Sequence, residues 1–173
     1  MNVLGFAASN SKQSINKQLV GYATSLFQSA NIELIDINDF EMPLYSVDRE
    51  QESGTPQRAK DFIQKIDQAD IIVVSLAEYN GSYTAAFKNL FDWASRVRAK
   101  VYENKQVVFL STSPGPNGAQ SVLASAVTSA PYFGATVVGS LSVPSFYDTF
   151  DVDNQALRDP VLVKQLEGII DSL

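Results

Sequence analysis

A run of polar and aromatic residues, Glu78–Tyr83, follows shortly after the apolar stretch Ile71–Val74. The apolar stretch does not alternate with polar residues, which is typical of a central strand in a parallel sheet that helices cover on both faces. Ligands bind at the carboxyl edge of such sheets. Asn80-Gly81 can turn sharply there and point peptide groups outward, because Gly tolerates positive φ and Asn is enriched at it. Tyr79 and Tyr83 add flat rings with polar tips, so the run predicts a site for a planar heteroaromatic ligand. The alternative is an ordinary strand-to-helix turn, in which Asn-Gly is common.

A second stretch with binding chemistry is the loop Ala8–Asn16, which lies between an apolar strand and a helix. It contains hydroxyls, amides and one lysine but no acid, and the free N–H groups at the start of a helix favour an anion. The loop therefore predicts a site for a terminal phosphomonoester. The alternative is plain helix capping by Ser11 or Ser14. No G-x-x-x-x-G-K or G-x-G-x-x-G pattern occurs, which excludes a nucleoside triphosphatase loop and argues against a dinucleotide fingerprint.

A third loop, Ser111–Gly118, is rich in proline and glycine. Pro114 and Pro116 stiffen it, while Gly115 and Gly118 allow a close backbone approach to the edge of a flat ligand. All three loops leave the carboxyl ends of predicted strands. Together they predict a phosphate pocket, an aromatic platform and a stiff rim at one edge of one sheet.

The composition excludes several kinds of chemistry. The 173 residues include no cysteine and no histidine. Disulfides, thiolate metal sites, a cysteine nucleophile and serine–histidine hydrolysis are therefore excluded, and we expect no metal centre. A net charge of −6 argues against nucleic acid as a partner, because nucleic-acid binding relies on basic patches. Met1–Ala8 is apolar but short and carries no basic residue, so we expect neither a signal peptide nor a membrane span, and a cytoplasmic protein.

The elements that must position the three loops follow a regular alternation of strand and helix. We expect strands at 3–7, 32–37, 71–74, 107–110 and 137–143, each followed by a helix with an apolar stripe. A long connection at about 38–54 is typical of binding loops, lids or disordered segments, and Thr55-Pro56 predicts a cap and first position of the next helix. The alternation predicts one α/β domain over residues 1–173, with a doubly wound sheet of five parallel strands.

These motifs resemble the NADPH-dependent FMN reductase family of flavodoxin-like proteins. The resemblance rests on Glu78–Ser82 with the following Lys88-Asn89 and Asp92–Arg96, on the serine-rich first loop that ends Ser14-x-Asn16, and on Ser113-x-Gly115-x-x-Gly118. Met42–Tyr45 and Phe150–Asp159 also follow the family's pattern. The resemblance covers essentially the whole chain and implies a flavodoxin-like strand order of 2-1-3-4-5.

The resemblance also implies a cofactor and a site. FMN would be bound by Ser9, Ser11, Lys12, Ser14, Ile15, Asn16, Ala77, Glu78, Tyr79, Asn80, Gly81, Ser113, Gly115 and Gly118, with Tyr45 and Tyr83 on the substrate face. It implies that NADPH or NADH donates a hydride, and that a small acceptor such as a flavin, quinone, azo compound or metal oxyanion receives it. No catalytic side chain is needed, because the flavin carries the chemistry. The helix with Lys88, Asn89, Asp92 and Trp93 packs against a partner subunit in similar proteins, which implies a homodimer or homotetramer.

The sequence departs from the family's pattern at three positions. Ser11 stands where the family commonly has an arginine, and Ala77 and Thr84 stand where it has prolines. Losing one charged hydrogen bond to a phosphate costs roughly 1.5–3 kcal/mol, and Lys12 can recover part of this as a point charge. We therefore expect FMN to bind but to be lost readily during purification.

Three other functions share this architecture. A flavodoxin-type electron carrier would favour a more enclosed flavin and an acidic docking surface, whereas the long loops here suit substrate access. A receiver domain needs an aspartate at the end of the third strand and a lysine after the fifth, where this chain has Ser75–Ala77 and Pro144-Ser145. A descendant that binds a partner but no flavin remains an alternative because of Ser11.

Overall fold

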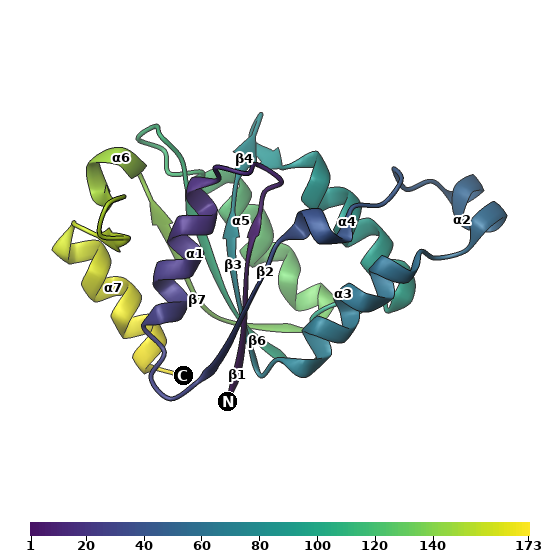
Figure 1. The fold of residues 1–173 in the computed structure, drawn as a ribbon, viewed down its shortest axis with the longest axis horizontal. Helices are drawn as coiled ribbons and strands as arrows, with labels where there is room; N and C mark the ends of the chain where they lie inside the picture. The colour runs from purple at the N-terminus through teal and green to yellow at the C-terminus, as the bar shows by residue number, and fades with distance from the viewer.

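A parallel sheet of five strands crosses the centre of the molecule in the order β2-β1-β3-β6-β7 (Figure 1). The computed structural model describes all residues, 1–173. The strands are β1 (Asn2–Ala8), β2 (Asn31–Ile35), β3 (Ile71–Leu76), β6 (Lys105–Thr112) and β7 (Ala135–Val143). Every residue of β3 is buried, as its unbroken apolar run predicts for a central strand. The predicted doubly wound sheet and its strand order are confirmed.

Helices cover both faces of the sheet. Helices α1 (Ile15–Ser25) and α7 (Pro160–Asp171) pack on one face, and α3 (Gln57–Gln68), α4 (Ala85–Val97) and α5 (Gln120–Ser129) pack on the other (Figure 1). Each face has its own hydrophobic cluster, with Phe62 and Trp93 fully buried in one and Phe146 and Phe150 in the other. The sheet is therefore a rigid platform for the loops at its edges.

The connection after β2 is more ordered than the sequence suggests. Ile37, expected in the strand, begins the 3-10 helix η1 (Ile37–Phe40), and the helix α2 (Val47–Ser53) follows. Ser46 caps α2 by accepting a hydrogen bond from the Arg49 N–H at 3.1 Å. Helix α2 buries no residue and projects from the body of the molecule (Figure 1). We call residues 44–54 the arm.

The remaining elements are short. They are the hairpin of β4 (Glu78–Tyr79) and β5 (Ser82–Tyr83), the 3-10 helix η2 (Ala130–Phe133), helix α6 (Phe146–Thr149), and the hairpin of β8 (Phe150–Asp151) and β9 (Ala156–Leu157). Helix α3 starts one residue later than expected, because Pro56 rather than Thr55 occupies the N-cap position. None of the helices combines the length and apolar character that crossing a bilayer requires.

Candidate functional site

The three predicted loops meet at one edge of the sheet. Ala8 at the end of β1 pairs with Leu76 at the end of β3, and Leu76 pairs with Ser111 on β6. The first loop (8–16), the hairpin that begins at Glu78 and the third loop (111–118) therefore leave the sheet at the same level. The convergence that the alternation of strands and helices predicts is confirmed.

The hairpin has the turn that Asn80-Gly81 predicts. Both residues have positive φ, at 54° and 75°, as a two-residue hairpin turn of type I′ requires. A Cβ on Gly81 would have no heavy atom within 4 Å, and the Tyr79 side chain is 54% exposed. Ala77, just before the hairpin, is buried. The tip of the hairpin thus has open space beside its backbone.

Glu78 joins the hairpin to helix α5. One of its carboxylate oxygens accepts a hydrogen bond from the Val122 N–H at 2.8 Å, in the first turn of α5. The N-cap residue of that helix, Ala119, has a left-handed backbone and no side chain that can cap. The Glu78 carboxylate therefore caps α5, although it lies 44 residues away in the sequence. The positive end of the helix dipole stabilises its negative charge.

The first loop leaves hydroxyl and cationic groups without partners in the chain. Ser14 is the N-cap of α1 but makes no side-chain capping bond, which excludes the simple capping alternative for this serine. Ser9 is buried and its Oγ accepts the Ser11 N–H at 3.2 Å, and Lys12 makes no ion pair. Ile15 is the first residue of α1. The helix start, one hydroxyl and one lysine are together available to an anion.

Asn16, also predicted in the site, uses its amide inside the protein. Its Oδ1 accepts a hydrogen bond from the Ser75 hydroxyl at 2.7 Å, and its Nδ2 donates to the Thr112 carbonyl at 3.4 Å. Asn16 is buried at the start of α1, so it links that helix to the ends of β3 and β6. Both polar atoms of its side chain therefore have protein partners beneath the loops.

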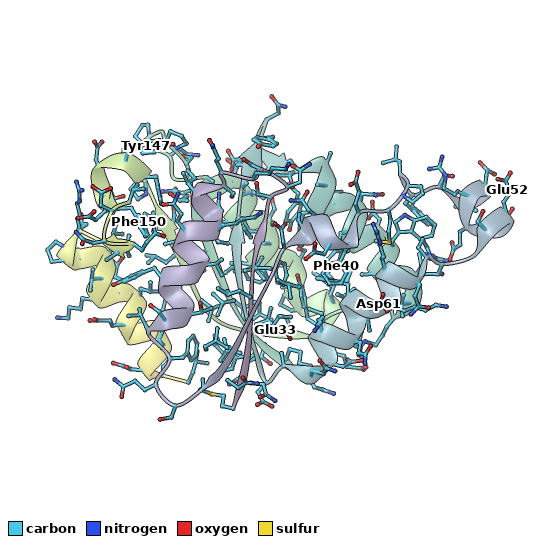
Figure 2. The ribbon with its side chains drawn as sticks, viewed as in Figure 1. Glu33, Phe40, Glu52, Asp61, Tyr147 and Phe150 are labelled. Atoms are coloured by element: carbon cyan, nitrogen blue, oxygen red, sulfur yellow. The ribbon has the colours of Figure 1, made fainter.

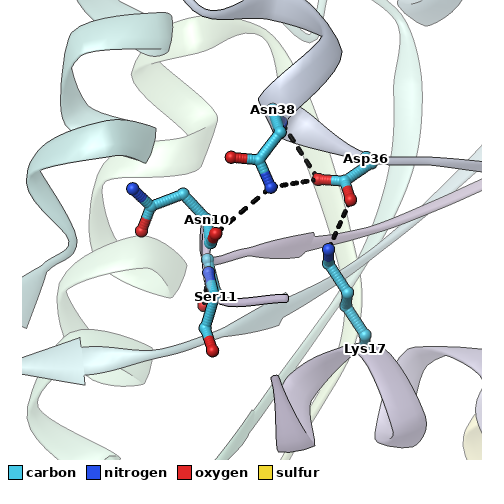
Figure 3. Close-up of polar contacts among 6 residues, drawn as sticks. Asn10, Ser11, Lys17, Asp36 and Asn38 are labelled. Atoms are coloured by element: carbon cyan, nitrogen blue, oxygen red, sulfur yellow. Dashed lines mark hydrogen bonds and ion pairs between the residues drawn. The ribbon is translucent and has the colours of Figure 1, made fainter. Parts of the chain in front are cut away.

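A network of hydrogen bonds and one ion pair, which the sequence did not predict, holds the first loop in place (Figure 3). Lys17 on α1 forms an ion pair with Asp36, and Asp36 accepts hydrogen bonds from the Asn38 N–H at 3.0 Å and the Asn38 side chain at 2.9 Å. Asn38 in turn donates to the Asn10 carbonyl at 3.2 Å. Partial burial raises the pKa of Asp36, but the hydrogen bonds from Lys17 and Asn38 outweigh it, and the net pKa lies below 3.8. The pattern Asp-x-Asn, typical of an Asx turn, is the sequence signal for this network.

The third loop is fixed by the segment that follows β7. The Gly115 carbonyl accepts the Ser145 N–H at 2.9 Å, and the Ser113 carbonyl accepts the Phe146 N–H at 3.0 Å. Gly118 has a φ of 58°, and a Cβ there would lie 2.3 Å from the Ser142 Oγ. At Gly115, by contrast, the nearest atom to an added Cβ is 4.0 Å away. Gly118 is thus required by packing, whereas Gly115 has open space beside it.

The two tyrosines predicted on the substrate face lie on different sides of α4. The Tyr45 ring packs edge-on against Trp93, with ring centroids 5.0 Å apart, and its hydroxyl donates to Glu50 at 3.2 Å. Tyr83 packs against Phe87, and its hydroxyl lies 3.5 Å from the Ser129 hydroxyl. The structure does not bring the two tyrosines together.

Helix α4 uses its polar residues mainly within the chain. The Asn89 Nδ2 donates to the Met42 and Pro43 carbonyls at 3.1 and 3.2 Å, and the Trp93 Nε1 donates to Pro43 at 2.7 Å. Lys88 and Asp92 pair with each other at 2.7 Å and face outward. Of the four residues that the resemblance places on a partner-facing helix, only Lys88 and Asp92 have outward-facing polar groups.

Thr84 is a second contact that the sequence analysis did not assign. Its hydroxyl donates to the Ala8 carbonyl at 3.0 Å and accepts the Phe87 N–H at 3.2 Å, which caps α4. Thr84 is buried, so this one side chain ties the start of α4 to the start of the first loop. A threonine just before an apolar-periodic helix is the sequence signal for such a cap.

Comparison with known proteins identifies relatives of this chain. Residues 1–148 match the NADPH-dependent FMN reductase family. An NADPH:quinone oxidoreductase of Arabidopsis thaliana is 34% identical over 70% of this chain and 62% of its own length. A 2-hydroxy-1,4-benzoquinone reductase of Burkholderia is 37% identical over 62% of this chain and 57% of its own length. The matched region thus spans about three fifths of each of these two relatives. The structure of FerB, a flavoenzyme NAD(P)H:(acceptor) oxidoreductase of Paracoccus denitrificans, superposes with a TM-score of 0.80 at 24% identity, over 99% of this chain and 93% of FerB.

Proposed function

This chain belongs to the NADPH-dependent FMN reductase family, and on that premise we propose that it binds FMN and uses it to pass a hydride from NADPH or NADH to a small acceptor. The observation that carries the proposal is the convergence of three loops at one sheet edge. The hairpin and the third loop each have a glycine with open space beside it, and the first loop has a helix start with groups free to bind an anion.

The first loop is the proposed phosphate site. Ser14 makes no side-chain capping bond and Lys12 makes no ion pair, and the first N–H groups of α1 have no partner within the helix. Ser9, Ser11 and Ile15 supply backbone and hydroxyl groups beside them. Asn16 acts from below by holding α1 against β3 and β6. The site has a lysine and no arginine, so it can offer the phosphate a single positive charge but not a bidentate guanidinium contact. We therefore expect a moderate affinity for FMN.

The flavin ring is proposed to lie between the hairpin and the third loop. Ala77 and Glu78 position the hairpin, and Tyr79, Asn80 and Gly81 present its tip to the ring. Ser113, Gly115 and Gly118 form the opposite rim, where the open space beside Gly115 admits a flat edge. Because both loops are fixed by long-range hydrogen bonds, little ordering is required when the cofactor binds.

The chain's own residues bind and orient the cofactor, and no side chain is required as an acid or base. When FMN is bound, it supplies the hydride chemistry, accepting a hydride from a nicotinamide and delivering it to an acceptor. Glu78, the only acid in the hairpin, is occupied by the Val122 N–H and is a positioning group. The absence of histidine is compatible with this division of labour.

The acceptor is proposed to be a small molecule, with a quinone as the first candidate because two relatives are named as quinone reductases. Free flavin, an azo compound and a metal oxyanion are the other acceptors to be tested. The requirement for NAD(P)H favours a cytoplasmic location, and a homodimer is the proposed assembly.

The test follows the flavin absorbance of the FMN-loaded protein in the absence of oxygen. Stopped-flow mixing with NADPH or NADH should bleach the flavin absorbance, and a quinone added afterwards should restore it. A flavin that accepts electrons only from a protein donor, and from neither nucleotide, would point instead to an electron carrier.

A further inference from the structure

A groove between helices α4 and α5 is lined by aromatic rings and encloses about 270 Å³. The rings belong to Tyr83, Phe87, Phe91, Tyr102, Phe109 and Phe133. No residue of the first loop, the third loop or the arm lines the groove, and Tyr83 is the one residue that it shares with the proposed substrate face. The groove is therefore a second site, separate from the sheet edge at which FMN is proposed to bind.

The Tyr102 side chain brings an unpaired polar group to this groove. Tyr102 is only 2% exposed, and its hydroxyl makes no hydrogen bond within the chain. Every fully enclosed side-chain polar atom of the protein does have a hydrogen-bond partner, so the Tyr102 hydroxyl must border open space. The groove is the open space that Tyr102 lines. Because an unpaired hydroxyl in a buried position is costly, the groove favours an occupant that bonds to it.

Two further hydroxyls of the groove are only loosely paired. Those of Tyr83 and Ser129 lie 3.5 Å apart, whereas a good O–H···O bond is about 2.7–2.8 Å long. Burial and, to a smaller extent, the neighbouring Tyr83 raise the pKa of Tyr102, so its hydroxyl stays protonated and can donate. The two charged residues of the groove, Lys88 and Asp92, pair with each other at 2.7 Å. The groove thus offers hydroxyl groups but no unpaired charge.

These properties define the chemistry of an occupant. Aromatic walls favour a flat ring, which can pack against them edge-on or offset. A charged ligand would lose its hydration without gaining a free counter-ion, so the occupant is uncharged. Pockets for larger ligands measure roughly 300–1,000 Å³, so this smaller groove suits a molecule of one or two fused rings. A hydroxyl on that ring can accept a bond from Tyr102 and donate one to Ser129 or Tyr83.

We propose that the groove between α4 and α5 is a binding site for a small, uncharged phenol whose hydroxyl bonds to Tyr102. The walls are in place before the ligand arrives. The Phe91 ring packs against Phe133 and Tyr102, with ring centroids 4.8 and 5.6 Å apart, and the Tyr102 N–H donates to the Phe133 carbonyl at 2.9 Å. Little ordering is therefore required on binding. The site goes beyond hydride transfer and does not depend on FMN.

Calorimetric titration of the FMN-free protein with 2-naphthol tests the site. We expect one saturable site with a Kd on the order of 0.1 mM, unchanged when the protein is first saturated with FMN. The matched probe 2-naphthoate has the same two rings but a carboxylate, and it should bind at least ~10-fold more weakly. Absence of saturable binding, displacement of 2-naphthol by FMN, or equal affinity for the two probes overturns the proposal.

Removal of one hydroxyl locates the bound probe. Tyr102→Phe should weaken 2-naphthol binding roughly 3- to 10-fold and leave the Tm of the free protein unchanged, because this hydroxyl makes no bond within the chain. The matched control is Tyr147→Phe, which removes the same atom from an exposed tyrosine. Figure 2 shows Tyr147 on α6, which packs with the hydrophobic cluster on the other face of the sheet. Equal affinity of Tyr102→Phe and the wild type overturns the proposal.

The outcomes separate this inference from the proposed function. A chain whose bound flavin is reduced by a nucleotide but that does not bind 2-naphthol contradicts this inference alone. A chain that binds 2-naphthol through Tyr102 but whose flavin no nucleotide reduces contradicts the proposed function alone.

Discussion

Replacement of Glu78 tests whether a carboxylate from the hairpin supports helix α5. Its bond to the Val122 N–H is 2.8 Å long, and the N-cap residue Ala119 offers no substitute. Loss of a capping side chain costs about 1 kcal/mol, and loss of the charge at the positive end of the helix costs about 0.3–1 kcal/mol more. Glu78→Ala should therefore lower the free energy of unfolding by about 1.3–2 kcal/mol, and Glu78→Gln by less than about 1 kcal/mol, because its amide oxygen can still accept the bond.

Thermal and urea unfolding of the two variants measure this difference. For a chain of this length, about 2 kcal/mol corresponds to a fall in Tm of roughly 4–8 °C. Hydrogen exchange at the Val122 amide should accelerate in Glu78→Ala, because that N–H loses its partner. The control is Glu167→Ala on the exposed side of α7, which should change stability by no more than about 0.5 kcal/mol. Equal stability of Glu78→Ala and the wild type, with Val122 still protected, would refute the reasoning.

The other predictions concern the third loop and the network beside the first loop. Gly118→Ala should cost about 2–4 kcal/mol, because the residue has a positive φ and its Cβ would press on Ser142. Gly115→Ala should leave the urea midpoint nearly unchanged but weaken FMN binding in a calorimetric titration, and unchanged FMN affinity would show that the cofactor does not approach Gly115. Asp36→Asn should reduce the unfolding free energy at pH 7 by less than about 1 kcal/mol, since its pair with Lys17 is partly exposed. The pKa of Asp36 is lowered in the folded protein, so its contribution is present above 3.8 and is lost as the pH falls through the lowered value. The difference between wild type and Asp36→Asn in urea unfolding should therefore disappear well below pH 3.8, and a difference that grows on acidification would contradict the network.

The fold and the meeting of the three loops could be predicted from the sequence, because both follow from local patterns. The unbroken apolar run Ile71–Val74 predicts a central strand, and parallel strands bring their carboxyl ends to one edge. The positive φ of Asn80 and Gly81 likewise follows from residue type.

The contacts that hold the loops could not be predicted, because their partners are distant in the sequence. Glu78 bonds to Val122 from 44 residues away, and Thr84 bonds to Ala8 from 76 residues away. Asn16 was predicted to bind the cofactor from the first loop, but its side-chain amide bonds to Ser75 and Thr112 beneath the loop. Residue type indicates that such a group needs a partner, but only the folded chain identifies the partner.

The arm shows a different limit of sequence reasoning. A connection of this length predicts a loop with a function, but the local pattern does not reveal which surface its apolar residues contact. Leu44 is 72% exposed and Val47 is 56% exposed, so the periodicity of apolar residues does not predict where these two side chains lie.

The central claim is that the three loops bind FMN in a form that a nicotinamide nucleotide can reduce. The most direct measurement is an oxygen-free stopped-flow experiment on the FMN-reconstituted protein, followed at the visible absorbance of oxidised flavin. Mixing with NADPH or NADH should bleach the bound flavin, and Gly115→Ala should lower the fraction of FMN that binds. If FMN at high micromolar concentration gives no binding heat, or if bound flavin stays oxidised with both nucleotides, the account is contradicted.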